Sequence, residues 1–210
     1  MPASAESSRA VDTVVFDIGG VLLDWDPRHL YRTLVDDPAD VEDFLARVCT
    51  SEWHHAHDLG VPIPESCAQL AREHPDRAEL IMAWAERGEE MIAGQIDGTV
   101  EVLADLSRAG VRCLALSNME AETFPLRRER FAFMRCFDGW VISGLEGVAK
   151  PDPAIVKLLL TRYQLDPART VLIDDKPDNI TMAEQAGLRA IRFADPGQLR
   201  RDLRALGLPA

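Results

Sequence analysis

The sequence has 210 residues, enough for one large domain or for one domain that carries an insertion. Its net charge of −12 argues against a nucleic acid or an anionic membrane as partner, because both attract basic surfaces. No apolar run approaches the ~20 residues that span a bilayer, and the polar first ten residues lack the apolar core of a secretory signal.

The four cysteines lie far apart in the sequence, without the Cys-x-x-Cys pairs that bind zinc or carry out redox chemistry. Buried, reduced thiols of this kind are typical of a cytoplasmic protein, which is the location we expect. The sequence leaves a monomer and a homodimer equally open.

The first predicted element is a buried strand at residues 12–17 that ends in the carboxylate of Asp17. Gly19-Gly20 then permits a sharp turn. Asp26-Pro27 is typical of a helix start, with aspartate as the cap and proline at the first helical position. From there to about residue 94 every signal is helical. The predicted helices cover residues 27–35, 39–49, 51–59, 64–73 and 76–92.

Strands and helices alternate in the second half of the chain. The predicted strands are 111–116, 140–143, 170–173 and 189–193, and the predicted helices are 99–109, 120–130, 153–163, 179–186 and 198–205. This alternation predicts an α/β fold with a doubly wound, Rossmann-like parallel sheet. The helical block after the first strand is then an insertion. We expect a core domain of residues 11–24 and 96–210 and a small α-helical cap domain of residues 25–95.

Reactive side chains follow three of the predicted strands, where an open parallel sheet binds its ligands. Asp17 follows the first strand, Ser117-Asn118 the second, and Asp174-Asp175 a later one. Lys150 precedes Pro-Asp-Pro and a helix. Alone, a Ser-Asn pair suits a turn equally well, and a lone lysine is usually solvated. Together these residues can hold a phosphoryl group beside a divalent metal and attack it.

The segments 14–22, 116–118, 149–153 and 171–175, in this order, resemble the motifs of the haloacid dehalogenase superfamily, and within it small phosphatases with a helical cap. Residues 16–26 also resemble a branch of sugar-phosphate phosphatases that carry Asp-x-Gly in place of Asp-x-Asp. The resemblance implies a haloacid dehalogenase-like fold. It also implies Mg²⁺-dependent hydrolysis of a small phosphorylated metabolite, such as a sugar phosphate, through an aspartyl-phosphate intermediate.

The resemblance implies a catalytic or binding role for each matching residue. Asp17 would be the nucleophile, with one carboxylate oxygen attacking phosphorus and the other binding Mg²⁺. Ser117 and Asn118 would hold the phosphoryl oxygens through a hydroxyl and neighbouring backbone amides. Lys150 would neutralise the nucleophile and the bound phosphate.

The implied metal ligands are all oxygens, as Mg²⁺ prefers. Asp175 would be the principal metal-binding aspartate, and Asp174 would bind directly or through water. Gly19 would contribute its main-chain carbonyl. Asp178 and Asn179 could support the metal ligands from behind or cap the N-terminus of the next helix, and the cap is the preferred interpretation.

Gly19 departs from the family pattern. Most relatives carry an aspartate there, which protonates the leaving group and then activates water, and glycine can do neither. A substrate that departs more easily, or water serving as the acid, could compensate. His54, His55 and His57 lie together on a predicted cap helix, where only His54 and His57 share a face. One of them could reach the site as a substitute acid, but packing at the surface and in the core is the preferred interpretation.

Three other functions remain open. A haloacid dehalogenase would share the fold, but it lacks the metal-binding acidic pair that Asp174-Asp175 supplies. The glycine at position 19 motivates a weakly catalytic phosphometabolite-binding or regulatory protein. A phosphomutase would need the acid/base that is absent here.

Overall fold

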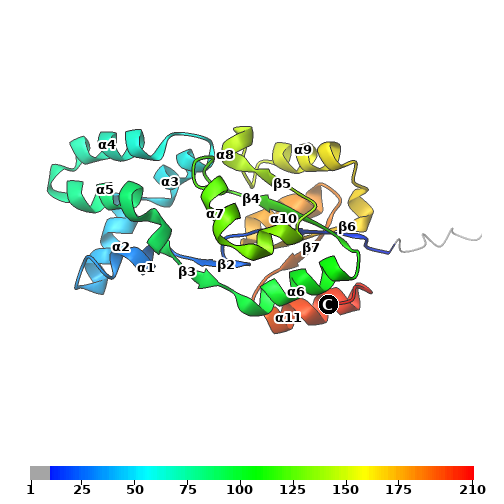
Figure 1. Cartoon of the computed structure of the whole chain (residues 1–210). Helices are drawn as coiled ribbons and strands as arrows, with labels where there is room; N and C mark the ends of the chain where they lie inside the picture. The colour runs from blue at the N-terminus through cyan, green and yellow to red at the C-terminus, as the bar shows by residue number, and fades with distance from the viewer. Residues whose placement is uncertain (1–9) are drawn as a thin grey trace, which may run out of the picture.

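The computed structural model describes residues 10–210 and contains a five-stranded parallel sheet in the order β5-β4-β1-β6-β7. Its strands are β1 (Thr13–Phe16), β4 (Arg112–Ser117), β5 (Gly139–Ile142), β6 (Thr170–Asp174) and β7 (Arg189–Arg192). The chain builds the sheet from β1 through β4 to β5, and then adds β6 and β7 on the other side of β1 (Figure 1). This doubly wound order confirms the predicted fold class.

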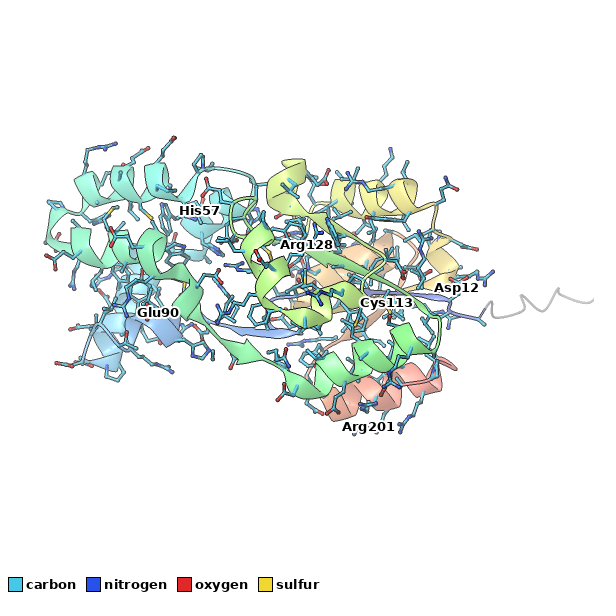
Figure 2. The ribbon with its side chains drawn as sticks, in the orientation of Figure 1. Asp12, His57, Glu90, Cys113, Arg128 and Arg201 are labelled. Atoms are coloured by element: carbon cyan, nitrogen blue, oxygen red, sulfur yellow. The ribbon has the colours of Figure 1, made fainter. Side chains whose placement is uncertain are left out.

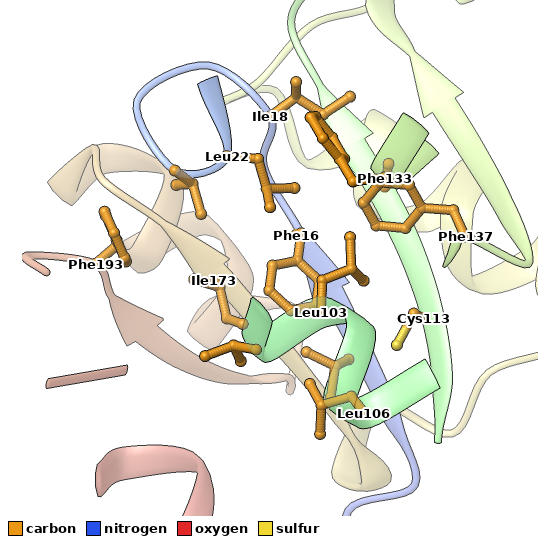
Figure 3. Close-up of a cluster of buried hydrophobic side chains, with 14 of the residues drawn as sticks. Phe16, Ile18, Leu22, Leu103, Leu106, Cys113, Phe133, Phe137, Ile173 and Phe193 are labelled. Atoms are coloured by element: carbon orange, nitrogen blue, oxygen red, sulfur yellow. The ribbon is translucent and has the colours of Figure 1, made fainter. Parts of the chain in front are cut away.

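Helices cover both faces of this sheet. One face packs against α6 (Asp97–Arg108) and α11 (Pro196–Ala205), which lie side by side, and the other against α9 (Pro153–Tyr163) and α10 (Pro177–Gln185) (Figure 1). In β1, Val14 and Phe16 belong to the α6 face and Val15 to the α9 face. Figure 3 shows Phe16 near Leu103 of α6 and Ile173 of β6. Burial on both faces explains the uninterrupted apolar run of β1.

Shorter elements complete the core and its connections. They are the helices α7 (Phe124–Arg130) and α8 (Ser143–Glu146), and the 3₁₀ helices η3 (Ala132–Cys136) and η4 (Pro167–Arg169). None of the helices within residues 10–210 combines the length and apolarity that crossing a membrane requires.

The chain between β1 and α6 forms a mainly helical unit with its own apolar centre. Its helices are α1 (Pro27–Tyr31), α2 (Pro38–Arg47), α3 (Ser51–Asp58), α4 (Ile63–Glu73) and α5 (Ala78–Arg87), with η1 (Pro75–Arg77) and η2 (Gly88–Met91) around α5. Tyr31, Phe44, Ile81 and Trp84 pack together there, in a cluster distinct from those of the sheet. Figure 2 shows His57 and Glu90 in this part, well away from Asp12 and Cys113. We propose that residues 25–95 are a cap domain and call them the cap.

The prediction of helices alone between the first strand and residue 94 is wrong. The strands β2 (Leu23–Trp25) and β3 (Ile92–Gln95) form an antiparallel ribbon that carries the chain into the cap and back (Figure 1). Each strand is very short, and Leu23 pairs with Gln95, a partner far away in the sequence. No local periodicity signals such a pairing, because its stabilisation comes from contacts between distant segments. The predicted helix 76–92 is accordingly divided into η1, α5, η2 and the start of β3.

Candidate active site

The predicted site residues meet at the carboxyl edge of the sheet. They lie beside the point between β1 and β6 where the order of adding strands reverses direction. Asp17 directly follows β1, and its N–H donates to the carbonyl of Ile173 in β6 at 2.9 Å. Ser117 and Asp174 are the last residues of β4 and β6. The sequence predicts each of them one residue after the end of its strand. Because β1 pairs in register with both strands, these side chains come to one level. Such reversals are the usual ligand sites of doubly wound sheets.

Asp17 is buried and held through both carboxylate oxygens. Its Oδ1 accepts hydrogen bonds from the Ile18 N–H at 2.7 Å and the Ser117 hydroxyl at 2.9 Å. Its Oδ2 lies 2.8 Å from Nζ of Lys150. Burial raises the pKa of Asp17, the charge of Lys150 lowers it in part, and the charge of Asp174 raises it again. The carboxylate is therefore oriented by fixed donors before any ligand binds.

Lys150 is only 2% exposed, which is rare for a lysine without charged partners. Its Nζ bridges Asp17 and Asp174, at 2.8 and 2.6 Å. Burial lowers the pKa of Lys150, but the two carboxylates outweigh burial and leave that pKa above its ordinary value. Asn118 fixes the lysine main chain: its Nδ2 donates to the carbonyl at 2.9 Å, and its Oδ1 accepts from the N–H at 2.8 Å. The Asn118 side chain thus positions Lys150. The predicted contact with phosphate involves the backbone amide of Asn118 and remains a prediction.

Asp174 is completely buried, and donors surround its carboxylate. Asn179 Nδ2 lies 2.9 and 3.0 Å from its two oxygens, and the Lys176 N–H donates to Oδ1 at 2.9 Å. Burial opposes ionisation, but Lys150 and these hydrogen bonds hold the pKa of Asp174 below its usual range. The prediction that Asp178 and Asn179 cap the next helix is wrong. Proline occupies the first position of α10 and Lys176 precedes it, which leaves Asn179 inside the helix and facing Asp174.

Asp17, Asp174 and Asp175 form a cluster that suits a hard divalent cation. Each offers one carboxylate oxygen, and these atoms lie within 4.8 Å of one another. Oδ1 of Asp175 is buried and lacks a hydrogen-bond partner within residues 10–210, and burial together with Asp174 raises its pKa. Among residues 10–210, Lys150 is the one buried lysine at this cluster, and it pairs with Asp17 and Asp174 but not with Asp175, so negative charge is left uncompensated. An all-oxygen donor set with excess negative charge fits Mg²⁺.

The turn after Asp17 brings backbone against this cluster. Gly20 has a φ of 74°, and a Cβ there would lie 2.9 Å from Oδ2 of Asp175. Glycine is therefore required at position 20 for conformation and for space. Gly19, by contrast, has nothing within 4 Å of the position of a Cβ. The metal-binding role expected for the Gly19 carbonyl remains a prediction.

A cavity of about 200 Å³ opens between these residues and the cap. It adjoins a larger cavity of about 730 Å³ that shares several of its lining residues. Besides predicted site residues, the smaller cavity is lined by Trp25, Asp58, Glu120, Arg127 and Lys176, which sequence analysis did not assign to the site. Of these five residues, only Lys176 has a sequence position, directly after the acidic pair, that indicates proximity to the site. The others reach the cavity from the ribbon, the cap, the loop after β4 and α7.

The three histidines of α3 point to different surroundings. His54 lines both cavities, and its Nε2 lies 3.3 Å from Oε1 of Glu120. His57 is fully buried and packs edge-on against Trp53, with ring centroids 4.4 Å apart. His55 is half-exposed, 3.6 Å from Asp58. Packing accounts for His57, as preferred from the sequence, whereas His54 faces the site.

Comparisons with known proteins agree with this arrangement. A model of the haloacid dehalogenase-like hydrolase family matches residues 11–187. The chain is 28% identical over 193 residues to a sesquiterpene phosphatase of Aspergillus oryzae, covering 91% of this chain and 94% of that protein. It is 26% identical over 190 residues to a phosphorylated carbohydrates phosphatase of Thermotoga maritima, covering 86% and 84%.

Solved structures share the fold. A HAD family enzyme from Bacteroides thetaiotaomicron has a TM-score of 0.71 at 20% identity, covering 89% of this chain and 95% of that one. Its wild-type complex with magnesium and inorganic phosphate has a TM-score of 0.68 at 20% identity, covering 88% and 95%. An L-2-haloacid dehalogenase from Xanthobacter autotrophicus has a TM-score of 0.60 at 16% identity, covering 95% and 84%. Since the family match spans most of the sequence, the chain belongs to the haloacid dehalogenase-like hydrolase family.

Proposed function

We propose that this hydrolase is a Mg²⁺-dependent phosphatase that acts on a small phosphorylated metabolite through a phosphoryl group carried by Asp17. The observation that carries the proposal is the carboxylate of Asp17, fixed between Ser117 and Lys150 beside the acidic cluster. Phosphatases among the relatives support it, as does the family enzyme that binds magnesium and inorganic phosphate.

In the first step, a carboxylate oxygen of Asp17 attacks phosphorus, and the bond from phosphorus to the leaving oxygen breaks. The Ser117 hydroxyl, which donates to Asp17 here, is within reach to donate to a phosphoryl oxygen once substrate binds. Lys150 stabilises the negative charge that passes between nucleophile and phosphate, at no cost of reorganisation because it is already held in place. In the second step, water attacks phosphorus and releases phosphate and Asp17.

Asp17, Asp175 and the Gly19 carbonyl would hold the metal ion, with Asp174 directly or through water. When bound, Mg²⁺ would supply charge neutralisation at the phosphoryl oxygens and align them for attack. Asn179 and the Lys176 N–H would orient Asp174 in this set, since both donate to it. The unpaired Oδ1 of Asp175, buried within the described part of the chain, is the atom that most needs a cation.

The alternative activities would require different residues in the site. A dehalogenase would not need the acidic pair, and in this chain the pair Asp174-Asp175 is complete, with the buried Oδ1 of Asp175 lacking a hydrogen-bond partner within residues 10–210. A protein that only binds a phosphometabolite would have no use for a carboxylate as firmly oriented as Asp17. The cavity next to Asp17 has both apolar and polar walls, which suits a small organic phosphate. We propose no narrower substrate on this ground.

Trapping with beryllium fluoride tests the proposal. In the presence of Mg²⁺, beryllium fluoride should bind Asp17 as a mimic of the phosphoryl group, detectable by ¹⁹F NMR, and Asp17→Asn should abolish the signal. The same variant should lose phosphate release with 4-nitrophenyl phosphate while its thermal unfolding stays close to that of the wild type. Residual activity in Asp17→Asn above a few per cent would place the nucleophile elsewhere.

A further inference from the structure

The position from which most relatives transfer a proton is empty in this chain. Gly19 has no side chain, and nothing lies within 4 Å of where its Cβ would be. Yet the leaving oxygen of an alkyl phosphate departs as a strong base and needs a proton. If the proposed phosphatase function holds, the proton comes either from water or from another group that lines the cavity beside Asp17.

His54 faces that cavity from the cap. Its side chain is 18% exposed, and it lines the same 200 Å³ space as Asp17 and Gly19. The ring stacks on Trp25, with centroids 5.0 Å apart and planes 17° apart. It also packs against Trp84, at 5.2 Å. Two indoles therefore fix the plane of the imidazole, and the His54 side chain remains part of the cavity lining.

Glu120 of the core orients His54. Its Oε1 lies 3.3 Å from His54 Nε2, while its Oε2 accepts from the Thr123 hydroxyl at 2.7 Å and from Arg127 at 3.2 Å. Burial raises the pKa of Glu120, but the hydrogen bonds and the Arg127 charge outweigh burial and hold that pKa well below its usual range. A carboxylate that stays ionised and accepts from one ring nitrogen fixes the tautomer and leaves the other nitrogen for proton transfer.

Other titratable groups lie close to His54, and carboxylate oxygens of Asp58 and Glu120 are within 4.8 Å of one of its ring nitrogens. On its own helix, Asp58 is buried with its Oδ1 lacking a partner among residues 10–210, and burial raises its pKa. Lys176, from the loop after β6, lines the same cavity and lowers the pKa of Asp58 in part. Arg127 of α7 forms an ion pair with Glu120. Burial lowers the pKa of His57 to about 4, so His57 stays neutral near pH 7 and serves as packing.

We propose that His54 is the proton-transfer residue of this site, positioned by Glu120. As the carboxylate of Asp17 forms its bond to phosphorus, the breaking bond leaves its electron pair on the departing oxygen, which takes the imidazolium proton and leaves as an alcohol. The neutral imidazole then removes a proton from the water that attacks phosphorus. Phosphate and the Asp17 carboxylate are released, and the imidazolium is restored.

Two phosphates of similar size separate this role from binding or packing. 4-Nitrophenolate leaves without a proton, whereas the alkoxide of benzyl phosphate requires one. For His54→Gln, kcat/KM for benzyl phosphate should fall by ~10²–10⁴, while that for 4-nitrophenyl phosphate should fall by less than about tenfold. His74→Gln, at the far end of α4, is the matched control and should change neither.

A second variant gives a readout that a purely structural role would not produce. Glu120→Gln keeps the shape of the side chain but removes the charge that stabilises the imidazolium. kcat/KM for benzyl phosphate should therefore fall by a larger factor than kcat/KM for 4-nitrophenyl phosphate, whose leaving group needs no proton. Equal losses on the two substrates in this variant would contradict the positioning role of Glu120.

The proposed function and the role of His54 can fail separately. If the wild type releases phosphate from neither substrate in Mg²⁺, the phosphatase proposal itself fails. If the wild type is active and folded His54→Gln loses equal factors on both substrates, or none on benzyl phosphate, only the proton-transfer role of His54 is overturned.

Discussion

Replacing Lys150 by methionine tests whether one buried ammonium holds the acidic site together. The side chains of Lys150, Asp17 and Asp174 are only 1%, 8% and 0% exposed. Removing one partner of a buried ion pair costs about 3–5 kcal/mol. Two carboxylates lose their partner here, so we expect the upper part of that range, about 4–5 kcal/mol at neutral pH without Mg²⁺. Proton uptake by Asp17 limits the cost, because its pKa is already raised.

Urea unfolding, followed by tryptophan fluorescence in EDTA, measures this loss. With a slope of about 2 kcal/mol per molar urea, the midpoint should fall by roughly 2 M. Lys157→Met is the matched control, because Lys157 is exposed on α9 and its replacement should cost less than about 0.5 kcal/mol. Adding Asp174→Asn to Lys150→Met should recover part of the loss, since it removes one uncompensated charge. If Lys150→Met lies within about 1 kcal/mol of the control, the buried carboxylates do not depend on this cation.

Three further outcomes are expected. Gly20→Ala should weaken Mg²⁺ binding by about 10–100-fold in calorimetry, because the added Cβ displaces Asp175. Gly19→Ala is the control and should have little effect, and equal effects of the two variants would contradict the steric argument. Glu120→Gln should lower the free energy of unfolding most at neutral pH. This loss relative to the wild type should shrink as pH falls below about 4.5, where the Glu120 carboxyl of the unfolded chain takes up its proton. A loss that does not change with pH would mean that the Glu120 charge is not responsible. Phosphate release should stop in EDTA and return with Mg²⁺, and full activity after exhaustive chelation would favour a metal-free reaction.

Local signals in the sequence were sufficient for most of the core. The helix predicted at 153–163 coincides with α9, because Asp152 caps it and Pro153 begins it. The doubly wound, parallel character of the sheet followed from the alternation of strands and helices, whereas the order of the strands was not predicted. The ribbon of β2 and β3 was missed, because its pairing joins segments at either end of the cap.

The residues that meet at the carboxyl edge of the sheet could be predicted as a set, because each follows a strand whose pattern is visible. Contacts across the cavity could not. The sequence has no local mark that Asn179 faces Asp174 from inside a helix, or that Glu120 meets His54 of the cap. Both contacts depend on how separate elements pack, which sequence periodicity does not report.

The central claim is that Asp17 carries the phosphoryl group during turnover, and acid quenching tests it most directly. A radiolabelled phosphate monoester is mixed with the enzyme in Mg²⁺, the reaction is stopped in acid, and the peptide that carries the label is identified. The account predicts a label on the peptide that contains Asp17, absent from Asp17→Asn. Phosphate release by the wild type with no label on the protein, or with a label on another residue, would contradict it.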